Sequence, residues 1–400
     1  MDALTTPSNW QRVRLGDIAE IIGGGTPSTQ ITSFWNGSIN WFTPTEIGIT
    51  KYVYKSQRTI TLLGLKKSSA KLLPIGTILL TSRASIGDCA ILKVVATTNQ
   101  GFQSLIPLEK INNEFLYYLM LTLKNKLLKL ASGSTFLEVS PNKIKNLLIP
   151  LPPLNEQIAI ANILSDVDRY LYSLDALILK KESVKKALSF ELLSQRKRLK
   201  GFNQAWQRVR LGTYKYRRGS FPQPYGNPQW YSDNGMPFVQ VYDVGENFKL
   251  TQKTKQKISK IAQPMSVFVP KNSVIITLQG TIGRVALTQY DCYCDRTILI
   301  FDNNTLNDVN KYFFVLSLFT KFEEEKRKAD GSIIKTITKQ TLKDFEILLP
   351  PLNEQIAIAN ILSDLDNEIA SLKNKKRQFD NIKKALNHDL MSAKIRVLNK

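Results

Sequence analysis

The sequence contains very few of the residues from which most metal and catalytic centres are built. In 400 residues there is one histidine, His388, and there are three cysteines, Cys89, Cys292 and Cys294. An odd number of cysteines without paired CxxC spacing argues against both a disulfide framework and a zinc site. Cys292 and Cys294, separated by one residue, could bind a metal, but we expect two buried structural thiols there. His388 lies in a basic, helical C-terminal stretch and has no evident catalytic companion.

Long apolar runs are also missing. The richest run, Phe313–Phe319, is far shorter than the ~18–20 residues that cross a bilayer. The first residues, MDALTTP, lack the basic and then apolar segments of an export signal. We therefore expect a cytoplasmic protein with no membrane partner.

The recognisable motifs of nucleotide and cofactor chemistry are absent as well. Gly23-Gly24-Gly25 precedes Thr-Pro and does not open a helix as a dinucleotide loop does, and no GxxxxGK[ST] sequence occurs. The run Asn227–Trp230 only partly matches the Asn-Pro-Pro-aromatic site of amino-methyltransferases, and no cofactor motif accompanies it. We expect no catalytic residues, no metal and no cofactor in this chain.

Acidic residues are scarce relative to basic ones. Fifty-five Lys and Arg against 33 Asp and Glu give a net charge of +22. This surplus is typical of a protein with a polyanionic partner, most often nucleic acid. The alternative is a basic surface that serves only solubility.

What the sequence does contain is a repeat. WQRVRLG occurs at 10–16 and 206–212, and PPLNEQIAIANILSD occurs at 152–166 and 350–364. KKAL recurs at 185–188 and 383–386. Fifteen identical residues in succession indicate a tandem duplication of a unit of about 200 residues.

Between these identical blocks the two copies agree only in pattern. Residues 76–92 and 272–288 both predict two apolar strands joined by a turn that ends in Ile-Gly, which is a β-hairpin. Residues 131–150 and 329–348 both open with a Gly-Ser turn. Each unit thus has a variable, mixed α/β front portion followed by a nearly invariant rear portion.

The rear portions predict long helices. Pro152-Pro153 ends the preceding segment, Asn155 is suited to capping the first turn, and apolar residues then recur at heptad spacing. Each helix spans about 40 residues, or about 60 Å, and needs a partner, for which the other copy is the simplest choice. The residues expected in this coiled coil are Ile160, Ile163, Val167, Leu174, Leu177, Ile358, Ile361, Leu365, Leu372 and Phe379.

Taken together, these motifs resemble the specificity subunit of type I restriction-modification enzymes. The resemblance covers the whole chain and is carried by residues 151–168 and their second copy 349–366, by residues 23–47, by the two hairpins and by SGSTFLEVSP at 132–141. It implies an α/β (α+β) fold, in which a mixed target-recognition domain and a long helix are duplicated and the two helices form an antiparallel coiled coil with pseudo-two-fold symmetry. The expected segments are recognition domain 1 (1–150), helical spacer 1 (151–200), recognition domain 2 (201–348) and helical spacer 2 (349–400).

The resemblance also implies partners. The family implies that double-stranded DNA is bound as a split, asymmetric site, that methyltransferase subunits, two in number, dock on the helical regions, and that restriction (translocase) subunits join them. S-adenosylmethionine, ATP and Mg²⁺ are then expected in those partners. The second front domain departs from the pattern because no GGTPS-like turn follows residues 206–212; we expect Tyr225–Trp230 to occupy the related place.

Candidate DNA contacts come from the turns whose content changes between the copies. Arg suits guanine and Gln suits adenine, while Lys and hydroxyl groups suit phosphates; the alternative is ordinary surface turns that have drifted. The candidates are Thr45, Lys51, Arg58, Lys66, Lys67, Ser82, Arg83, Ser85, Ser134, Thr135, Gln240, Tyr242, Lys253, Lys255, Gln279, Thr281, Arg284, Ser332 and Lys335.

Two other functions compete with this interpretation. A stand-alone nuclease would use the acid-x-Lys pair Glu324 and Lys326, although a solvated helix face is the better explanation of that charged run. A structural protein would use its long helices only to hold other proteins. The first predicts Mg²⁺-dependent cutting by the isolated chain, and the second predicts no salt-sensitive DNA affinity.

Overall fold

The computed structural model describes residues 7–132, 137–245, 247–280, 282–328 and 339–397. Contacts divide the chain into two compact units, unit 1 with residues 1–177 and 373–400, and unit 2 with residues 178–372. The division falls inside the two long helices, so each helix contributes to both units. The predicted division into four segments is a different partition, and its boundaries remain a prediction.

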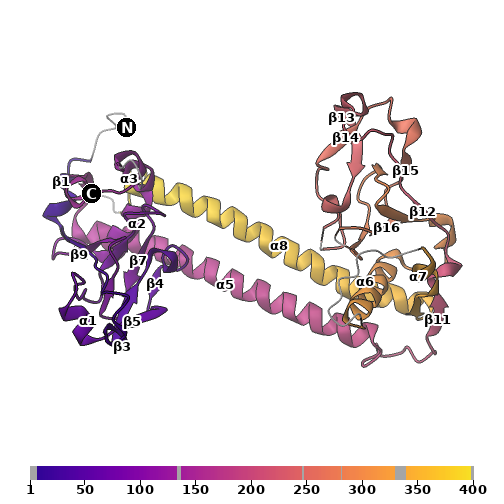
Figure 1. Ribbon diagram of the computed structural model, residues 1–400, viewed down its shortest axis with the longest axis horizontal. Helices are drawn as coiled ribbons and strands as arrows, with labels where there is room; N and C mark the ends of the chain where they lie inside the picture. The colour runs from indigo at the N-terminus through magenta and orange to yellow at the C-terminus, as the bar shows by residue number, and fades with distance from the viewer. Residues whose placement is uncertain (1–6, 133–136, 246, 281, 329–338, 398–400) are drawn as a thin grey trace. The chain divides into compact units, whose positions relative to one another are not determined.

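In its described residues, unit 1 contains three small sheets and four short helices in addition to its parts of the two long helices (Figure 1). Its strands are β1 (Gln11–Arg14), β2 (Ala19–Gly23), β3 (Trp35–Phe42), β4 (Tyr52–Val53), β5 (Arg58–Ile60), β6 (Ile78–Leu80), β7 (Cys89–Leu92), β8 (Ala96–Thr98), β9 (Gln103–Pro107) and β10 (Leu148–Leu151). Its short helices are α1 (Leu62–Lys66), α2 (Asn113–Thr122), α3 (Lys124–Leu130) and α4 (Pro141–Lys145). The strand orders are β1-β10, β2-β9-β6-β7-β4 and β5-β3-β8.

Unit 2 repeats this plan. Its strands are β11 (Gln207–Arg210), β12 (Tyr216–Arg218), β13 (Tyr231–Val239), β14 (Gln256–Ile258), β15 (Val267–Val269), β16 (Val274–Thr277), β17 (Val285–Leu287), β18 (Cys292–Cys294), β19 (Ile298–Phe301) and β20 (Glu346–Leu349). Its helices before the last are α6 (Lys311–Lys328) and α7 (Lys339–Asp344). The orders β11-β20, β12-β19-β16-β17 and β14-β13-β18-β15 match those of unit 1 strand for strand, apart from the two added edge strands β4 and β15.

The predicted hairpins are confirmed. In unit 1, β6 pairs antiparallel with β7, with Leu79 opposite Ala90. In unit 2, β16 pairs antiparallel with β17, with Ile275 opposite Ala286. All four of these residues are buried, as the continuous apolar runs in the sequence require.

The two predicted long helices are also confirmed, as α5 (Leu154–Leu193) and α8 (Leu352–Met391), of 40 residues each. Asn155 lies one residue inside α5, where its side-chain oxygen accepts a hydrogen bond from the amide of Glu156 at 2.9 Å. That amide belongs to the first turn, which has no intrahelical acceptor. Among the described residues, no helix combines the length and apolar content needed to cross a bilayer.

Within each unit the two helices pack in opposite directions. In unit 1, Asp168 pairs with Lys383 and Asp175 pairs with Lys376, at 2.6 Å for the second pair. In unit 2, Lys181 pairs with Glu368 at 2.8 Å and Lys185 pairs with Asp366. In both units the residue number falls along α8 as it rises along α5, which is antiparallel packing. The pairs of Lys383 and Lys185 are exact repeats, 198 residues apart.

The buried seam lies about one position away from the predicted stripe. Of the expected residues, Ile160, Leu174 and Ile358 are buried, and Leu177 is 38% exposed, so its assignment was wrong. The others, Ile163, Val167, Ile361, Leu365, Leu372 and Phe379, are half-buried. The most buried positions of the seam include residues spaced seven apart on each helix, one heptad, as helix pairing requires: Leu164, Leu171, Ile178, Leu362 and Ile369.

Each unit's main core is completed by the end of the other repeat's helix. Leu390 and Met391 of α8 are buried in the unit 1 core beside Ile160 and Leu164 of α5. In the same way, Leu192 of α5 is buried in the unit 2 core. Polar residues of the identical block join the start of each long helix to the front domain of its own repeat, because Gln157 and Gln355 each accept a hydrogen bond from a backbone amide of that domain, at 2.8 and 2.9 Å.

Candidate nucleic-acid interface

The turn between β6 and β7 holds the first candidate base-reading residue. The Thr81 hydroxyl donates to the Ser85 carbonyl at 2.6 Å and accepts from the Asp88 amide at 3.0 Å. Ala84 and Gly87 both have positive φ, so the turn has a defined and unusual backbone path. The Arg83 side chain is 42% exposed at this turn, and Ser85 is half-buried.

A second segment is joined to that turn. Glu138 forms an ion pair with Arg83, with an Nη2–Oε2 distance of 2.9 Å. The Val139 amide donates to the Ser82 carbonyl at 3.1 Å, and Ser132 and Glu138 exchange backbone hydrogen bonds at 3.0 and 3.1 Å. Ser82 itself is buried, so we remove it from the proposed DNA surface. The predicted contacts Ser134 and Thr135 lie outside the described residues.

The matching turn of unit 2 has the same frame with different content. The Arg284 amide donates to the Thr277 hydroxyl at 3.0 Å, as Asp88 does to Thr81. Gln279 is exposed at the position that corresponds to Arg83. The Arg284 guanidinium donates to the Val244 carbonyl at 3.1 Å, which holds it against the protein backbone. The predicted contacts Thr281, Ser332 and Lys335 lie outside the described residues.

The loops after the two long strands β3 and β13 are equivalent to each other. Each forms a 3₁₀ turn with reciprocal capping, by Thr43 and Glu46 in unit 1 and by Gln240 and Asp243 in unit 2. Thr45 is exposed on the first turn. Tyr242 is exposed on the second, where its hydroxyl contacts Gln240. The Lys255 ammonium lies 5.1 Å from the Tyr242 ring centroid.

The candidate phosphate-binding residues are mostly exposed. Lys66 and Lys67 lie at the end of α1, and Lys253 lies in the loop before β14. Arg58 stacks its guanidinium on the Trp35 ring at 3.8 Å. Stacking fixes the plane of the guanidinium without using its donors, so this arginine remains a candidate.

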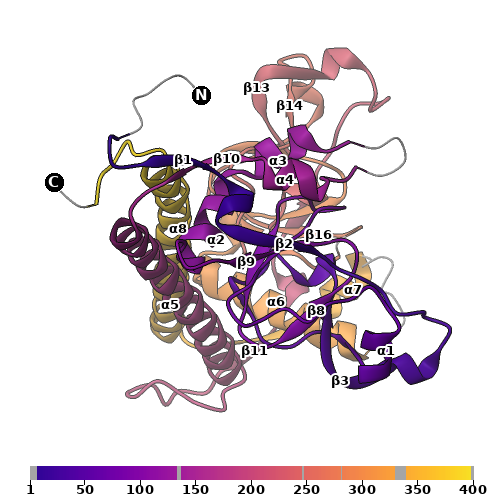
Figure 2. The same ribbon diagram turned by 90° about the vertical axis from the view of Figure 1, so that its left-hand side faces the viewer.

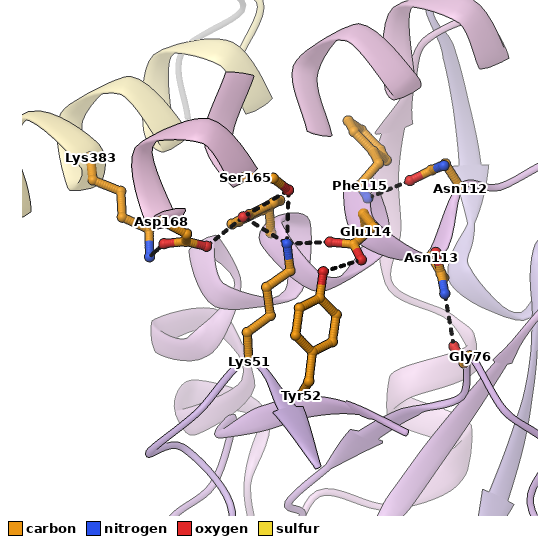
Figure 3. Close-up of polar contacts among 11 residues, drawn as sticks. Lys51, Tyr52, Gly76, Asn112, Asn113, Glu114, Phe115, Ser165, Asp168 and Lys383 are labelled. Carbon is orange, nitrogen blue, oxygen red and sulfur yellow. Dashed lines mark hydrogen bonds and ion pairs between the residues drawn. The ribbon is translucent and has the colours of Figure 1, made fainter. Parts of the chain in front are cut away.

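Lys51 was predicted to contact the DNA backbone, but its side chain is only 11% exposed. It donates to the Tyr118 hydroxyl at 2.8 Å and the Ser165 hydroxyl at 2.9 Å, and it forms an ion pair with Glu114 (Figure 3). Burial lowers the pKa of Lys51, and the hydrogen bond to Glu114 opposes that effect. We therefore remove Lys51 from the DNA surface, because it links the front domain to α5.

The cluster extends to both long helices. Asp168 of α5 accepts from the Tyr118 hydroxyl at 2.5 Å and pairs with Lys383 of α8 (Figure 3). Figure 2 shows α2, which carries Tyr118, beside the two helices. In unit 2 the place of Lys51 is taken by Phe248, whose carbonyl accepts the equivalent strand hydrogen bond from Leu287 at 3.0 Å. From the sequence alone, Lys51 cannot be distinguished from the other lysines of this region.

The prediction for the unit 2 counterpart of the Gly23–Gly25 turn was also wrong. A side chain at Gly24 would collide with the carbonyl oxygen of Asn99, next to the end of β8. Gly219 meets the same obstacle at Asp295, next to the end of β18. The residues Asn227–Trp230 instead form the 3₁₀ turn that leads into β13, as Thr32–Phe34 leads into β3. Gly219, rather than a residue of Tyr225–Trp230, is therefore the structural counterpart of Gly24.

The groups proposed for a nuclease each have another charged neighbour on α6. Lys326 pairs with Glu323 at 2.7 Å, and Lys321 lies 3.7 Å from Glu324, both on the surface of α6. Among the described residues there is no group of three or more His, Cys, Asp or Glu side chains that could hold a metal. The three cysteines are free and buried, which confirms the expectation for Cys292 and Cys294.

Two elements of the site could not have been chosen from sequence by residue type alone. Glu138 lies in the segment that follows the first Gly-Ser turn, outside the hairpin. The sequence feature that relates it to Arg83 is its opposite charge. Arg396 anchors the buried Glu156, with an Nε–Oε1 distance of 2.9 Å, and Arg198 repeats this contact at Glu354. The signal for the arginines was present, because they recur at the offset of 198 residues found for the long identical block.

Comparison with known proteins is consistent with this architecture. The profile described as "Type I restriction modification DNA specificity domain" matches residues 7–181 and 221–379. The MjaIX specificity subunit of Methanocaldococcus jannaschii is 43% identical over 166 residues, which are 40% of this chain and 38% of that protein. A second relative, the putative MjaX specificity subunit of the same organism, is 28% identical over 98% of this chain and 95% of its own length.

Two solved structures share the fold. The S subunit of a type I restriction-modification system from M. genitalium superposes with a TM-score of 0.61 at 17% identity, covering 97% of each chain. The HsdS subunit from Thermoanaerobacter tengcongensis gives a TM-score of 0.53 at 20% identity, covering 98% of this chain and 99% of that one. Because the profile matches most of both repeats, the chain belongs to the type I restriction-modification DNA specificity family.

Proposed function

We propose that this chain is the DNA-recognition subunit of a type I restriction-modification assembly and performs no chemistry itself. Each unit reads one half of a split, asymmetric site in double-stranded DNA. The observation that carries this proposal is the pair of hairpin turns, whose frames match at Thr81 and Thr277 while the presented residues are Arg83 and Gln279. Equal frames with unequal contents are what two reading heads with different half-sites require.

The net charge of +22 supports a large phosphate contribution to binding. The exposed residues Lys66, Lys67 and Lys253, together with Arg58, are proposed phosphate contacts. If six to ten phosphates are engaged, affinity falls ~10³–10⁵-fold between 50 and 200 mM salt. Removing both Lys66 and Lys67 is expected to lower the salt slope by about 1 per lost contact, without changing the preferred sequence.

We propose that methyltransferase subunits dock on the start of each long helix. Leu154 and Ile158 are exposed there, one helical turn apart, and Leu352 and Ile356 repeat them in the second copy. An apolar pair kept exposed in both copies suits a partner surface, and two copies provide two docking positions. Restriction (translocase) subunits would then join through this assembly. S-adenosylmethionine, ATP and Mg²⁺ belong to the partners in this proposal.

The decisive experiment is a reconstitution. The purified chain alone is expected to give no methylation and no Mg²⁺-dependent cleavage. Addition of a methyltransferase subunit and S-adenosylmethionine is expected to give methylation at one split sequence. Methylation without sequence preference, or cutting by the isolated chain, would refute the proposal.

Docking is tested by Ile158→Glu combined with Ile356→Glu. Co-elution with the methyltransferase subunit is expected to be lost, while DNA affinity is retained. Leu179→Glu is the matched control, because Leu179 is exposed on α5 but its repeat counterpart is Arg377. Equal loss in the control would contradict a specific docking position.

A further inference from the structure

We propose that Arg83 and Glu138 act together as one base-reading unit that selects a G·C base pair in the half-site of unit 1. This inference rests on the proposed DNA-recognition function and specifies one position of the target. Its basis is that the hairpin turn and the segment around Glu138 bring a donor and an acceptor together, with Nη2 and Oε2 2.9 Å apart.

The spacing of these two atoms matches the major-groove edge of a G·C pair. Guanine presents its N7 and O6 acceptors there, and cytosine presents its N4 donor. The O6 and N4 atoms are hydrogen-bonded to each other at about 2.9 Å. A guanidinium directed at guanine therefore places a carboxylate at the distance of its own ion pair beside the cytosine amino group. A reversed or A·T pair offers a different order of donors and acceptors.

The pair is held by backbone contacts rather than by the ion pair itself. Arg83 and Glu138 are bridged as residues on adjacent antiparallel segments, and the Val139 amide donates to the Ser82 carbonyl at 3.1 Å. The side chains are 42% and 33% exposed. An ion pair exposed to this degree adds little to stability, so the fold alone gives no strong reason to keep both charges.

A phosphate-binding role explains the geometry less well. A carboxylate at 2.9 Å from the guanidinium would repel a phosphate and cancel much of the attraction of the arginine. Base reading uses both signs, because the base pair offers both acceptors and a donor. In unit 2 the corresponding turn presents the neutral Gln279, so the G·C requirement is assigned to unit 1 only.

The test is selection of duplexes from a randomised library by the full-length chain. The variants are Arg83→Ala, Arg83→Lys, Glu138→Ala and the double variant Arg83→Ala/Glu138→Ala. We expect each single variant to lower the preference for G·C at one and the same position by about 10- to 100-fold. The double variant should lose no more than the larger single loss. Arg83→Lys should keep overall affinity while losing the preference, because lysine cannot make the forked contact.

The matched control is the surface pair Arg208 and Glu346, with an Nη1–Oε2 distance of 3.2 Å, replaced by alanine in the same way. These variants should leave the selected sequence unchanged. The half-site of unit 2 serves as an internal check on folding, because its preference should persist in every Arg83 and Glu138 variant.

The outcomes separate this inference from the function on which it rests. If the unaltered chain selects a split sequence but Arg83→Ala and Glu138→Ala relax different positions, or none, the base-reading unit is refuted while the function stands. A uniform loss of affinity for all duplexes would also refute it and would indicate backbone contact. If the unaltered chain selects no sequence, the proposed function fails and this inference fails with it.

Discussion

Arg396 and Glu156 lie 240 residues apart in the chain and form an ion pair, with an Nε–Oε1 distance of 2.9 Å, on a glutamate side chain that is 2% exposed. The Trp10 indole donates to the same carboxylate at 3.1 Å. Unit 2 repeats the arrangement with Arg198, Glu354 and Trp206. Each unit thus carries a buried carboxylate whose charge is balanced by an arginine just after the helix of the other repeat.

Replacement of Arg396 by alanine is expected to destabilise unit 1 by about 3 kcal/mol, because it leaves a buried carboxylate without its cation. Urea unfolding followed by tryptophan fluorescence measures this, since Trp10 reports on the site. Arg208→Ala is the control, because Arg208 pairs with Glu346 on the surface and its loss should cost under about 1 kcal/mol. Equal destabilisation by the two variants would show that the carboxylate does not depend on Arg396.

How far the sequence predicts this anchor depends on which residue is considered. Trp10 and Glu156 both lie in blocks that are identical in the two copies, so their importance was visible. Arg396 follows the periodic part of its helix. Its recurrence as Arg198 at the offset of 198 residues was visible, but the sequence did not show which carboxylate either arginine contacts. Periodicity located both long helices, and the repeat predicted their pairing. The heptad seam was placed about one residue off because the apolar stripe is wide enough to accept either register.

Local sequence patterns could not predict the order of the strands in each sheet or which charged residues are buried. The hairpins β6-β7 and β16-β17 follow from short-range alternation of apolar runs and turns. The parallel pairing of β3 with β8 joins strands more than 50 residues apart, and no local signal specifies it. Lys51 likewise looked like its exposed neighbours in the sequence, because it is distinguished by its contacts with Glu114, Tyr118 and Ser165 in the folded chain.

Gly24→Ala and Gly219→Ala are each expected to destabilise their own unit, because a Cβ atom at either position would collide with a backbone carbonyl that cannot move independently. The expected cost is about 1–3 kcal/mol, the usual range for overpacking. Thermal unfolding is the measurement. Gly226→Ala is the matched control, since a Cβ atom there would meet nothing within 4 Å. Comparable losses at Gly24 and Gly226 would refute the packing argument.

The three cysteines should be unreactive in the folded chain. Burial raises the pKa of the Cys89 thiol to about 12 and that of Cys294 well above its usual value. All three thiols are buried, and the reactive form of a thiol is its exposed thiolate, so a disulfide reagent at pH 8 should label none of them under native conditions and all three in guanidinium. Rapid native labelling of one thiol would show that its strand opens readily.

The Lys51 cluster should give stability an unusual pH dependence. The pKa of Lys51 is lowered chiefly by burial, so between that value and the ordinary value of about 10.4 the unfolded chain binds more protons than the folded chain. Stability from this group therefore rises with pH across that window. Lys51→Met removes the titrating group, so the stability of the unaltered chain relative to this variant should increase as the pH rises through that window. Burial also raises the pKa values of Tyr52 and Tyr118, but their ionisation in the unfolded chain affects both proteins alike. Urea midpoints measured at each pH provide the comparison, with exposed Lys66→Met as the matched control. A relative stability that falls as pH rises would show that the ion pair with Glu114, rather than burial, controls the charge of Lys51.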